Sequence, residues 1–340
     1  MSTYPELSRV RWSVLDRALI RQGQEPAEAL RATVAFARDA EALGYHRFWV
    51  AEHHAVPGVA GSAPTVLAAA VASATSRIRV GTGGVMLPNH RPLVVAEQFG
   101  VLAALFPGRI DMGFGRSLGF TGAVRRALGV ERASSDDFAE RLTEVLDYFA
   151  GTGPVRAQPA QGLTVPAFVL AGGAGVDTAA DLGLPLVLAV SADRDRTRAA
   201  AERYRARFTP GRQGGGPHLT LAANVAVAAT AEAAERRQLP EAWAVVHSRT
   251  RGDFPPLDAP DTVLARRLSG REREYLDAAR AGQIHGDEPT VARALTRLID
   301  ATEPDEMLLT LATHGEEERL DSYRRLAHIA GLRTDAVVPG

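Results

Sequence analysis

Two side-chain types are missing from this 340-residue sequence, and each absence removes a class of chemistry. No cysteine occurs, which excludes thiol nucleophiles, disulfides, iron–sulfur clusters and thiolate zinc sites. No lysine occurs either, so all 39 basic residues are arginine. Schiff-base and pyridoxal-phosphate catalysis need a lysine amine, and a P-loop needs its lysine, so these mechanisms are excluded as well.

Strong charge bias and long apolar runs are also missing. The 39 basic and 40 acidic residues are interspersed and leave a formal net charge of −1, so nothing indicates binding to nucleic acid or to an anionic membrane. No uninterrupted run of about 18 apolar residues occurs, and the first ten residues lack the basic and apolar regions of a signal peptide. We therefore expect a soluble, cytoplasmic protein that acts on a small molecule.

Short β-type runs alternate with helix-type segments along the chain, which is typical of parallel βαβ units. We expect strands at residues 10–15, 47–51, 77–81, 109–115, 167–171, 185–190, 218–227 and 307–311. Helices are expected at residues 25–43, 62–74, 92–105, 134–149, 176–182, 193–208, 289–301 and 316–330. Eight strand–helix pairs predict an α/β protein with a single (β/α)8 TIM barrel over residues 1–340. The polar stretch at about 230–286, between the seventh strand and its helix, is expected to be an insertion with helices of its own.

Glu52, His53 and His54 follow the second predicted strand, at the end of the barrel where active sites lie. Alternation along a strand predicts that only His53 faces the barrel mouth and that His54 turns away. A histidine there can transfer protons near neutral pH, with Glu52 orienting it or a ligand. A surface or packing pair explains these residues equally well on their own. A metal site is disfavoured, because no further ligand has metal-site spacing.

Glycines follow the third and fourth strands. Gly83 and Gly84, and the small face formed by Gly113 and Gly115, are expected to leave room for a flat ligand near the backbone. The plain alternative is that glycine is common in a chain that holds 32 of them. The spacing from Gly113 to Gly119 misses the dinucleotide fingerprint by one residue, so a nicotinamide-binding domain is not expected.

An anion site is expected after the fourth and fifth strands. Arg116 is a fixed cation suited to phosphate, although an ordinary exposed arginine is the plain alternative. Gly172, Gly173 and Ala174 open a helix, where free N–H groups favour an anion, or else they form a tight turn. Nearby, small glycines together with Phe114 and Phe120 predict a roomy apolar mouth for a hydrophobic substrate.

Several blocks of the sequence closely resemble the bacterial-luciferase-like flavin-dependent monooxygenases. They are GYHRFWVAEHH at residues 44–54, RIRVGTGGVMLPNH at 77–90, AEQF at 96–99 and PGRID at 107–111. Near the C-terminus, TLATH at 310–314, with Arg319, Ser322 and Tyr323, resembles the signature of the same family. The resemblance spans nearly the whole chain and is weakest through residues 230–286.

The resemblance implies an enzyme that uses reduced FMN as a cosubstrate, supplied by a separate, transiently bound flavin reductase, to oxygenate a small hydrophobic compound with O2. By position, His53 matches the catalytic histidine of the family, Glu52 a residue near the flavin, and Arg116 the arginine that contacts the flavin phosphate. Gly83 and Gly84 match the bulge that packs on the isoalloxazine. The resemblance also implies a homodimer formed through the helices at 62–74 and 92–105, and secondary metabolism is a plausible setting.

Two departures from the family pattern bear on the cofactor. Gly172-Gly173 stands where close relatives have a Gly-Ser-Ser type segment, which removes hydroxyl donors to phosphate, and residues 116–119 replace an Arg-Ala-Pro-Gly loop. Three other interpretations are open at this point. They are a deazaflavin-dependent oxidoreductase on the same barrel, a catalytically silent flavin-binding protein, and a metal-dependent hydrolase that uses residues 52–54.

Overall fold

Eight parallel strands form a closed barrel in the computed structural model, which describes residues 4–118, 121–130 and 137–333. The barrel strands are β1 Arg11–Asp16, β2 Arg47–Val50, β3 Arg79–Thr82, β5 Ile110–Gly115, β6 Ala167–Leu170, β7 Leu186–Ala189, β8 Leu219–Val227 and β10 Glu306–Thr310. Strand β10 pairs with both β1 and β8, and this double pairing closes the sheet. The predicted (β/α)8 barrel is confirmed.

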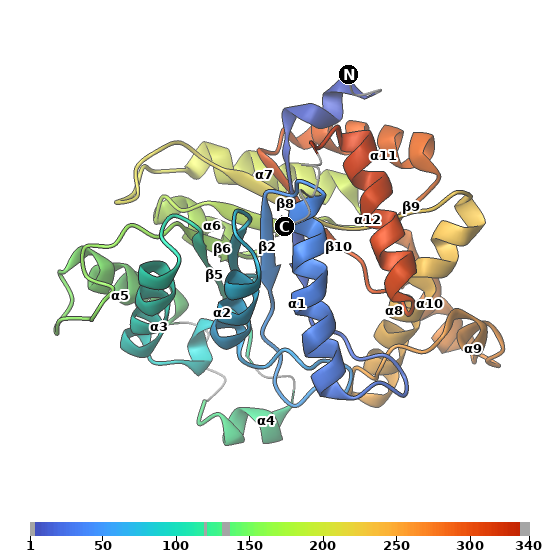
Figure 1. The fold of residues 1–340 in the computed structure, drawn as a ribbon, viewed down its shortest axis with the longest axis horizontal. Coiled ribbons are helices and arrows are strands. Elements are labelled where there is room, and N and C mark those ends of the chain that lie inside the picture. Colours follow the sequence, from blue (N-terminus) through green and yellow to red (C-terminus); the bar gives the residue numbers. More distant parts are fainter. Residues whose placement is uncertain (1–3, 119–120, 131–136, 334–340) are drawn as a thin grey trace, which may run out of the picture.

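Helices surround the barrel on its outside (Figure 1). The outer helices are α1 Pro26–Ala42, α2 Pro64–Ala74, α3 Pro92–Leu105, α5 Phe138–Ala150, α6 Gly175–Asp181, α7 Arg194–Arg207, α11 Glu288–Thr302 and α12 Glu316–Ala330. Local sequence sets their ends, as α1 shows. Glu25 and Glu28 form a reciprocal capping box at its start, and Gly44 follows its end with φ at +82°, as expected of a glycine after a helix.

Short elements precede the barrel or lie between a strand and its outer helix. They are the 3-10 helices η1 Pro5–Arg9 and η2 Leu87–Asn89, the strand β4 Val85–Met86, and the helix α4 Gly122–Ala127. Strand β4 pairs in parallel with β5 beyond the end of β3, so the chain continues along β5 toward the mouth of the barrel there. Gly119, Phe120 and the first residues of the predicted helix at 134–149 lie outside the described residues.

The stretch at 230–286 holds three helices and a strand on one side of the barrel (Figure 1). They are α8 Ala231–Arg251, α9 Pro260–Leu264, α10 Gly270–Ala281 and β9 Ile284–Gly286. Leu239, Trp243, Val263 and Leu276 belong to a small hydrophobic cluster within this stretch. Strand β9 pairs in parallel with the last residues of β8, which attaches the helices to the C-terminal rim of the barrel.

The interior of the barrel is layered. At the N-terminal ends of the strands, the buried Arg47 side chain bonds Asp111 at 2.7 Å and Glu306 at 2.9 Å. Above these charges lies an apolar layer that includes Trp49 and Phe168, whose rings meet edge to face. Filled layers of this kind make such a barrel a packed core, so any ligand must sit at the C-terminal mouth.

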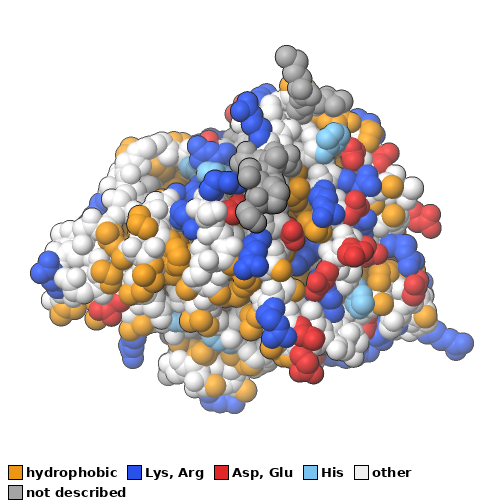
Figure 2. Space-filling model, in the orientation of Figure 1, with side chains coloured by type: hydrophobic (Ala, Val, Ile, Leu, Met, Phe, Trp, Pro, Cys, Tyr) orange, Lys and Arg blue, Asp and Glu red, His pale blue; other side chains and the backbone are white. Residues whose placement is uncertain are grey.

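The outer surface carries apolar side chains on α2 and α3. Val66 is 69% exposed on α2, and Leu105 is 65% exposed on α3, with Val94 and Val101 also exposed there. Figure 2 shows hydrophobic side chains over this face. Among the described residues, no helix is long and apolar enough to cross a membrane.

Candidate active site

A cavity of about 310 Å³ opens at the C-terminal end of the barrel. Its lining comes from the segments after β2 and β3, from β4, from the end of β5 and the loop after it, and from the last residue of β6. The lining residues are Ala51, Glu52, His53, His54, Gly83, Gly84, Met86, Gly115, Ser117, Leu118 and Leu170. This volume lies at the lower end of the range for small-molecule sites. The structure therefore brings four predicted site residues together, namely Glu52, His53, Gly83 and Gly84.

Both histidines after β2 line this cavity, so the expectation that His54 turns away is wrong. Strand β2 ends at Val50, and the alternation of a strand does not extend to irregular backbone beyond it. The His53 backbone N–H donates to the Gly61 carbonyl at 2.9 Å, which fixes the loop. Burial and the nearby Arg17 charge lower the pKa of His53 to about 4, so its imidazole is neutral at neutral pH.

Glu52 is a buried carboxylate that accepts three hydrogen bonds. Its Oε1 atom accepts from His54 Nε2 at 2.6 Å and from His90 Nε2 at 2.8 Å. Its Oε2 atom accepts from the Met86 backbone N–H at 2.9 Å. Burial by itself raises the pKa of Glu52, but the bonds from His90, Met86 and His54 outweigh it and lower the pKa. The carboxylate is therefore ionised, and it ties the loop after β2 to β4.

His90 is the residue that the sequence interpretation missed. It follows η2 and lies 38 positions from Glu52 in the chain, so no local spacing connects the two. One donor atom each from Glu52, His54 and His90 lies within 4.8 Å of the others. The expectation that no third candidate ligand accompanies residues 52–54 is therefore wrong, because the fold brings His90 beside Glu52 and His54.

The glycines around the cavity serve two different purposes. A Cβ on Gly113 would lie 1.9 Å from the Thr82 carbonyl oxygen, and a Cβ on Gly84 would lie 2.8 Å from the Gly113 oxygen. These two glycines allow β3, β4 and β5 to approach closely, so the expectation that Gly113 leaves room for a ligand is wrong. Gly115 does face open space, since its nearest neighbour would be Val85 oxygen at 4.0 Å.

The expected aromatic wall of the mouth is also different. Phe114 is fully buried, and its ring packs edge to face against Phe99 at 5.9 Å, in the core beside α3. Phe114 therefore does not line the cavity. The apolar part of the cavity lining includes Met86, Leu118 and Leu170 instead.

Arg116 and the turn before α6 lie side by side at the exposed edge of this site. Arg116 is exposed, between the lining residues Gly115 and Ser117. A Cβ on Gly175 would come within 3.6 Å of the Arg116 Cδ atom, so the arginine side chain runs along the start of α6. Gly172 and Gly173 are exposed, and a Cβ on either would meet nothing within 4 Å. A fixed cation thus faces open backbone, an arrangement that can hold a phosphate.

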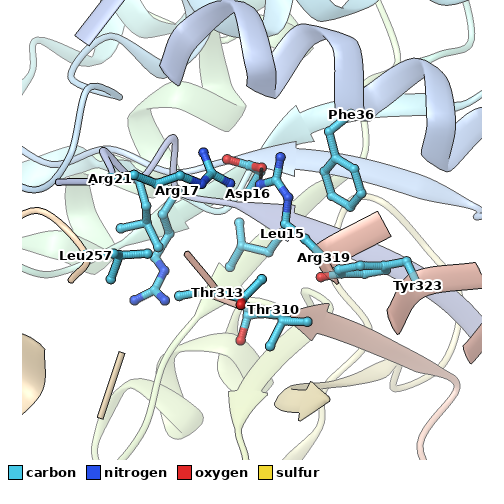
Figure 3. Close-up of a pocket in the computed structure, with 13 residues that line it drawn as sticks. Leu15, Asp16, Arg17, Arg21, Phe36, Leu257, Thr310, Thr313, Arg319 and Tyr323 are labelled. Atoms are coloured by element: carbon cyan, nitrogen blue, oxygen red, sulfur yellow. Dashed lines mark hydrogen bonds and ion pairs between the residues drawn. The ribbon is translucent and has the colours of Figure 1, made fainter. Parts of the chain in front are cut away.

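A second cavity, of about 20 Å³, lies between the C-terminal ends of β1 and β10 (Figure 3). Arg21 and Arg319 flank Asp16, whereas the Arg17 guanidinium points away from it (Figure 3). Arg319 bonds Asp16 at 2.8 Å and Arg17 pairs with Glu241.

The charges in this second cavity are therefore paired. Arg21 completes the set by bonding Glu316 at 3.0 Å, and the space is about that of a few waters. We assign these ion pairs a structural role, because Arg319 and Glu316 lie on α12 and their partners belong to β1 and the loop after it.

Comparison with known proteins places the chain in a family. The sequence matches the luciferase-like monooxygenase family over residues 10–334. A luciferase-like monooxygenase of Escherichia coli (strain K12) is 34% identical over 92% of this chain and 95% of its own length. The N-acetyl-S-alkylcysteine monooxygenase of Bacillus subtilis (strain 168) is 32% identical over 94% of this chain and 97% of its own. The crystal structure of apo-MsnO8 is 34% identical, with a TM-score of 0.84 over 97% of this chain and all of that one.

More distant solved structures share the fold with different cofactors. An FMN complex of the oxygenating constituent of a Pseudomonas putida diketocamphane monooxygenase is 16% identical, with a TM-score of 0.71 over 94% of this chain and 97% of that one. A secondary alcohol dehydrogenase that depends on the deazaflavin F420 is 15% identical, with a TM-score of 0.68 over 94% and 99%. The same fold thus occurs in one protein that binds FMN and in another that binds F420. The chain belongs to the luciferase-like monooxygenase family, whose members are oxidoreductases.

Proposed function

We propose that this protein uses reduced FMN and O2 to oxygenate a small organic compound, with the reduced flavin supplied by a separate reductase. One observation carries the proposal. His53, Gly83 and Gly84 line a cavity whose rim residues Gly115 and Ser117 flank Arg116, and the Arg116 side chain lies beside Gly175 at the start of α6. A flat ring and a phosphate would thus each meet a suitable surface. The proposal gives this protein no nicotinamide-binding domain with which to reduce FMN, so a separate reductase must supply the reduced flavin.

The residues around the cavity have distinct tasks in this proposal. Bound reduced FMN supplies the electrons that activate O2. Gly83 and Gly84 present bare backbone to the ring, while Arg116 and the N–H groups of Gly172 to Ala174 hold the phosphate at the exposed edge. The neutral His53 holds or moves a proton at its imidazole nitrogens. Glu52 fixes the position of β4 through Met86, and this is a positioning role.

The substrate is proposed to be small and largely apolar. Met86, Leu118 and Leu170 give one side of the cavity an apolar surface, and the histidines give the other side hydrogen-bonding groups. The B. subtilis relative is named for a thioether-containing amino-acid derivative, which has both kinds of surface. S-alkylcysteine derivatives therefore belong in a substrate panel beside aromatic compounds. Secondary metabolism stays a prediction.

A homodimer through α2 and α3 is proposed as the assembly. Four large apolar side chains, Val66, Val94, Val101 and Leu105, are exposed on these two helices. An apolar groove between α1 and α2 adjoins them and includes Val66. Exposed apolar patches of this kind mark association surfaces.

The test is a reconstituted reaction. The purified protein is combined with an unrelated flavin reductase, NADH, FMN, ¹⁸O-labelled O2 and the substrate panel. We expect a product that carries one ¹⁸O atom and that requires both reductase and protein. Turnover without O2, given reduced F420 in place of FMN, would establish the deazaflavin alternative. Binding of reduced FMN with no product from any arm would support a silent flavin-binding protein.

A further inference from the structure

Glu52, His54 and His90 form a compact cluster that the proposed flavin chemistry does not fully use. They come from two segments, the loop after β2 and the residue after η2, and their donor atoms lie within 4.8 Å of one another. Within the described part of the chain, no other three residues of metal-binding type meet in this way. Two imidazoles and one carboxylate are the ligand set of many three-residue metal sites.

We propose that this cluster binds one divalent transition-metal ion of the zinc class, through the Glu52 carboxylate and the Nε2 atoms of His54 and His90. Nitrogen and oxygen ligands of this kind suit Zn²⁺, Co²⁺ and Ni²⁺. Three protein ligands leave a fourth tetrahedral position for water or another small ligand. That position is available because Glu52 and His54 line the 310 Å³ cavity.

The distances require only a small adjustment. The two Nε2 atoms lie 2.6 and 2.8 Å from Glu52 Oε1, whereas ligand atoms around tetrahedral Zn²⁺ are about 3.3 Å apart, given bonds of about 2.0–2.1 Å. Each imidazole therefore has to retreat by roughly half an ångström. The histidine side chains have room to do so, because they are 19% and 30% exposed.

The surroundings of Glu52 support a metal site. Its other oxygen, Oε2, is held by the Met86 backbone N–H at 2.9 Å, and such outer contacts orient the ligands of a metal. Both imidazoles would bind the ion through Nε2, which requires any single ring proton to sit on Nδ1.

The competing interpretation is that the three side chains only hydrogen-bond to one another and fix the loop after β2. Both interpretations use the same contacts, but they differ in the response to a metal. A cluster that is only hydrogen-bonded would not bind added Co²⁺, whereas a metal site would bind one ion per chain. Metal binding would also stabilise the fold, since the ligands join two separate segments.

The experiment is a Co²⁺ titration of tag-free, metal-stripped full-length protein without flavin, followed by visible absorbance and then by displacement with Zn²⁺. We expect one Co²⁺ per chain, a visible spectrum that Zn²⁺ abolishes, and a rise in Tm with Zn²⁺. His90→Ala and His54→Ala should each weaken binding at least tenfold. His328→Ala is the matched control, because His328 also pairs with a glutamate, at 3.2 Å from Glu288, but on the surface.

The outcomes separate cleanly. Absence of a Co²⁺ spectrum and of a Zn²⁺-dependent Tm rise in the parent protein would overturn the proposal, as would undiminished binding in either His90→Ala or His54→Ala, provided that the variant folds. Circular dichroism shows which variants fold, and either folded variant is sufficient to decide. Because no flavin is present, the result does not depend on the proposed oxygenase function.

Discussion

At the scale of single residues, the environment of His53 determines what it can do. Its pKa is lowered to about 4, first by burial and then by Arg17, so it does not carry a positive charge between pH 6 and pH 8. It can still donate or accept a hydrogen bond as a neutral imidazole. A group of this kind can hold a proton close to reacting atoms without adding charge to them.

We predict that His53→Ala lowers the rate of product formation by about 10²–10⁴-fold, the usual contribution of general acid–base assistance. Hydrogen peroxide formed per NADH consumed should rise toward one, because the electrons are then lost to uncoupled reduction of O2. Between pH 6 and pH 8, the pH–rate profile of the parent should show no ionisation that is absent from the profile of His53→Ala, because the pKa of His53 lies well below this range. Equal coupling in parent and variant would remove His53 from the reaction.

Arg116→Ala should weaken the binding of reduced FMN by about 10–100-fold, because the charge-assisted bond to a phosphate is worth about 1.5–3 kcal/mol. Riboflavin, which lacks the phosphate, should bind parent and variant equally in the same titration. Arg198→Ala is the control, since Arg198 is an exposed arginine on α7 with only a local partner. Unchanged FMN affinity in Arg116→Ala would show that the phosphate lies elsewhere.

The residues predicted from the sequence were those that directly follow strands. Glu52, His53, Gly83 and Gly84 could be placed at the mouth because parallel strands end at one rim. His90 could not, because its contact with Glu52 joins residues 38 positions apart and depends on the path of the chain through β4 and η2. The predicted orientation of His54 was wrong because side chains alternate only within a strand, and β2 ends at Val50, before His54.

At the scale of elements, α2 and α3 present an apolar face that the barrel does not use. Leu105→Arg should convert a dimer to a monomer, because a desolvated, unpaired charge at such an interface costs several kcal/mol. Leu264→Arg is the control, as Leu264 is 59% exposed on α9, away from this face. Sedimentation at micromolar concentration measures the outcome. A parent protein that is already monomeric would contradict the proposed assembly.

The order and type of the elements could be predicted from the sequence, because hydrophobic runs and helix caps are local signals. All eight predicted strands are present as barrel strands. The short strands β4 and β9 were not predicted, since two or three residues carry too little pattern. Their pairing depends on the neighbours β5 and β8, which only the closed barrel brings beside them.

At the scale of the whole molecule, buried charges at the closed end of the barrel contribute to its stability. Glu306→Gln should lower the free energy of unfolding by about 3–5 kcal/mol, because Arg47 is left with an incomplete partner in the interior. Asp300→Asn should change it by about 0–1 kcal/mol, since the Arg9–Asp300 pair is exposed to solvent. Chemical denaturation of both variants measures the contrast. Equal effects would show that the buried network adds nothing.

The same network predicts how stability depends on pH. Burial alone raises the pKa of Glu306, but the neighbouring His218 and Arg47 lower it to about 2 from 4.5. Its contribution is therefore present above pH 4.5 and is lost as the pH falls from 4.5 toward 2. The unfolding free energy of the parent should decline through this range, and Glu306→Gln should flatten the decline. An identical slope in both proteins would contradict the assigned pKa.

The proposed oxygenase activity depends on reduced FMN being held in the cavity beside His53. The most direct test is rapid mixing of anaerobic protein and reduced FMN with O2, following flavin reoxidation and hydrogen peroxide release beside free reduced FMN. At saturating protein, we expect flavin reoxidation to follow a different time course from that of free flavin, with hydrogen peroxide release delayed. In Arg116→Ala, the time course should return toward that of free flavin. Identical time courses with and without saturating protein would contradict binding of reduced FMN in this cavity.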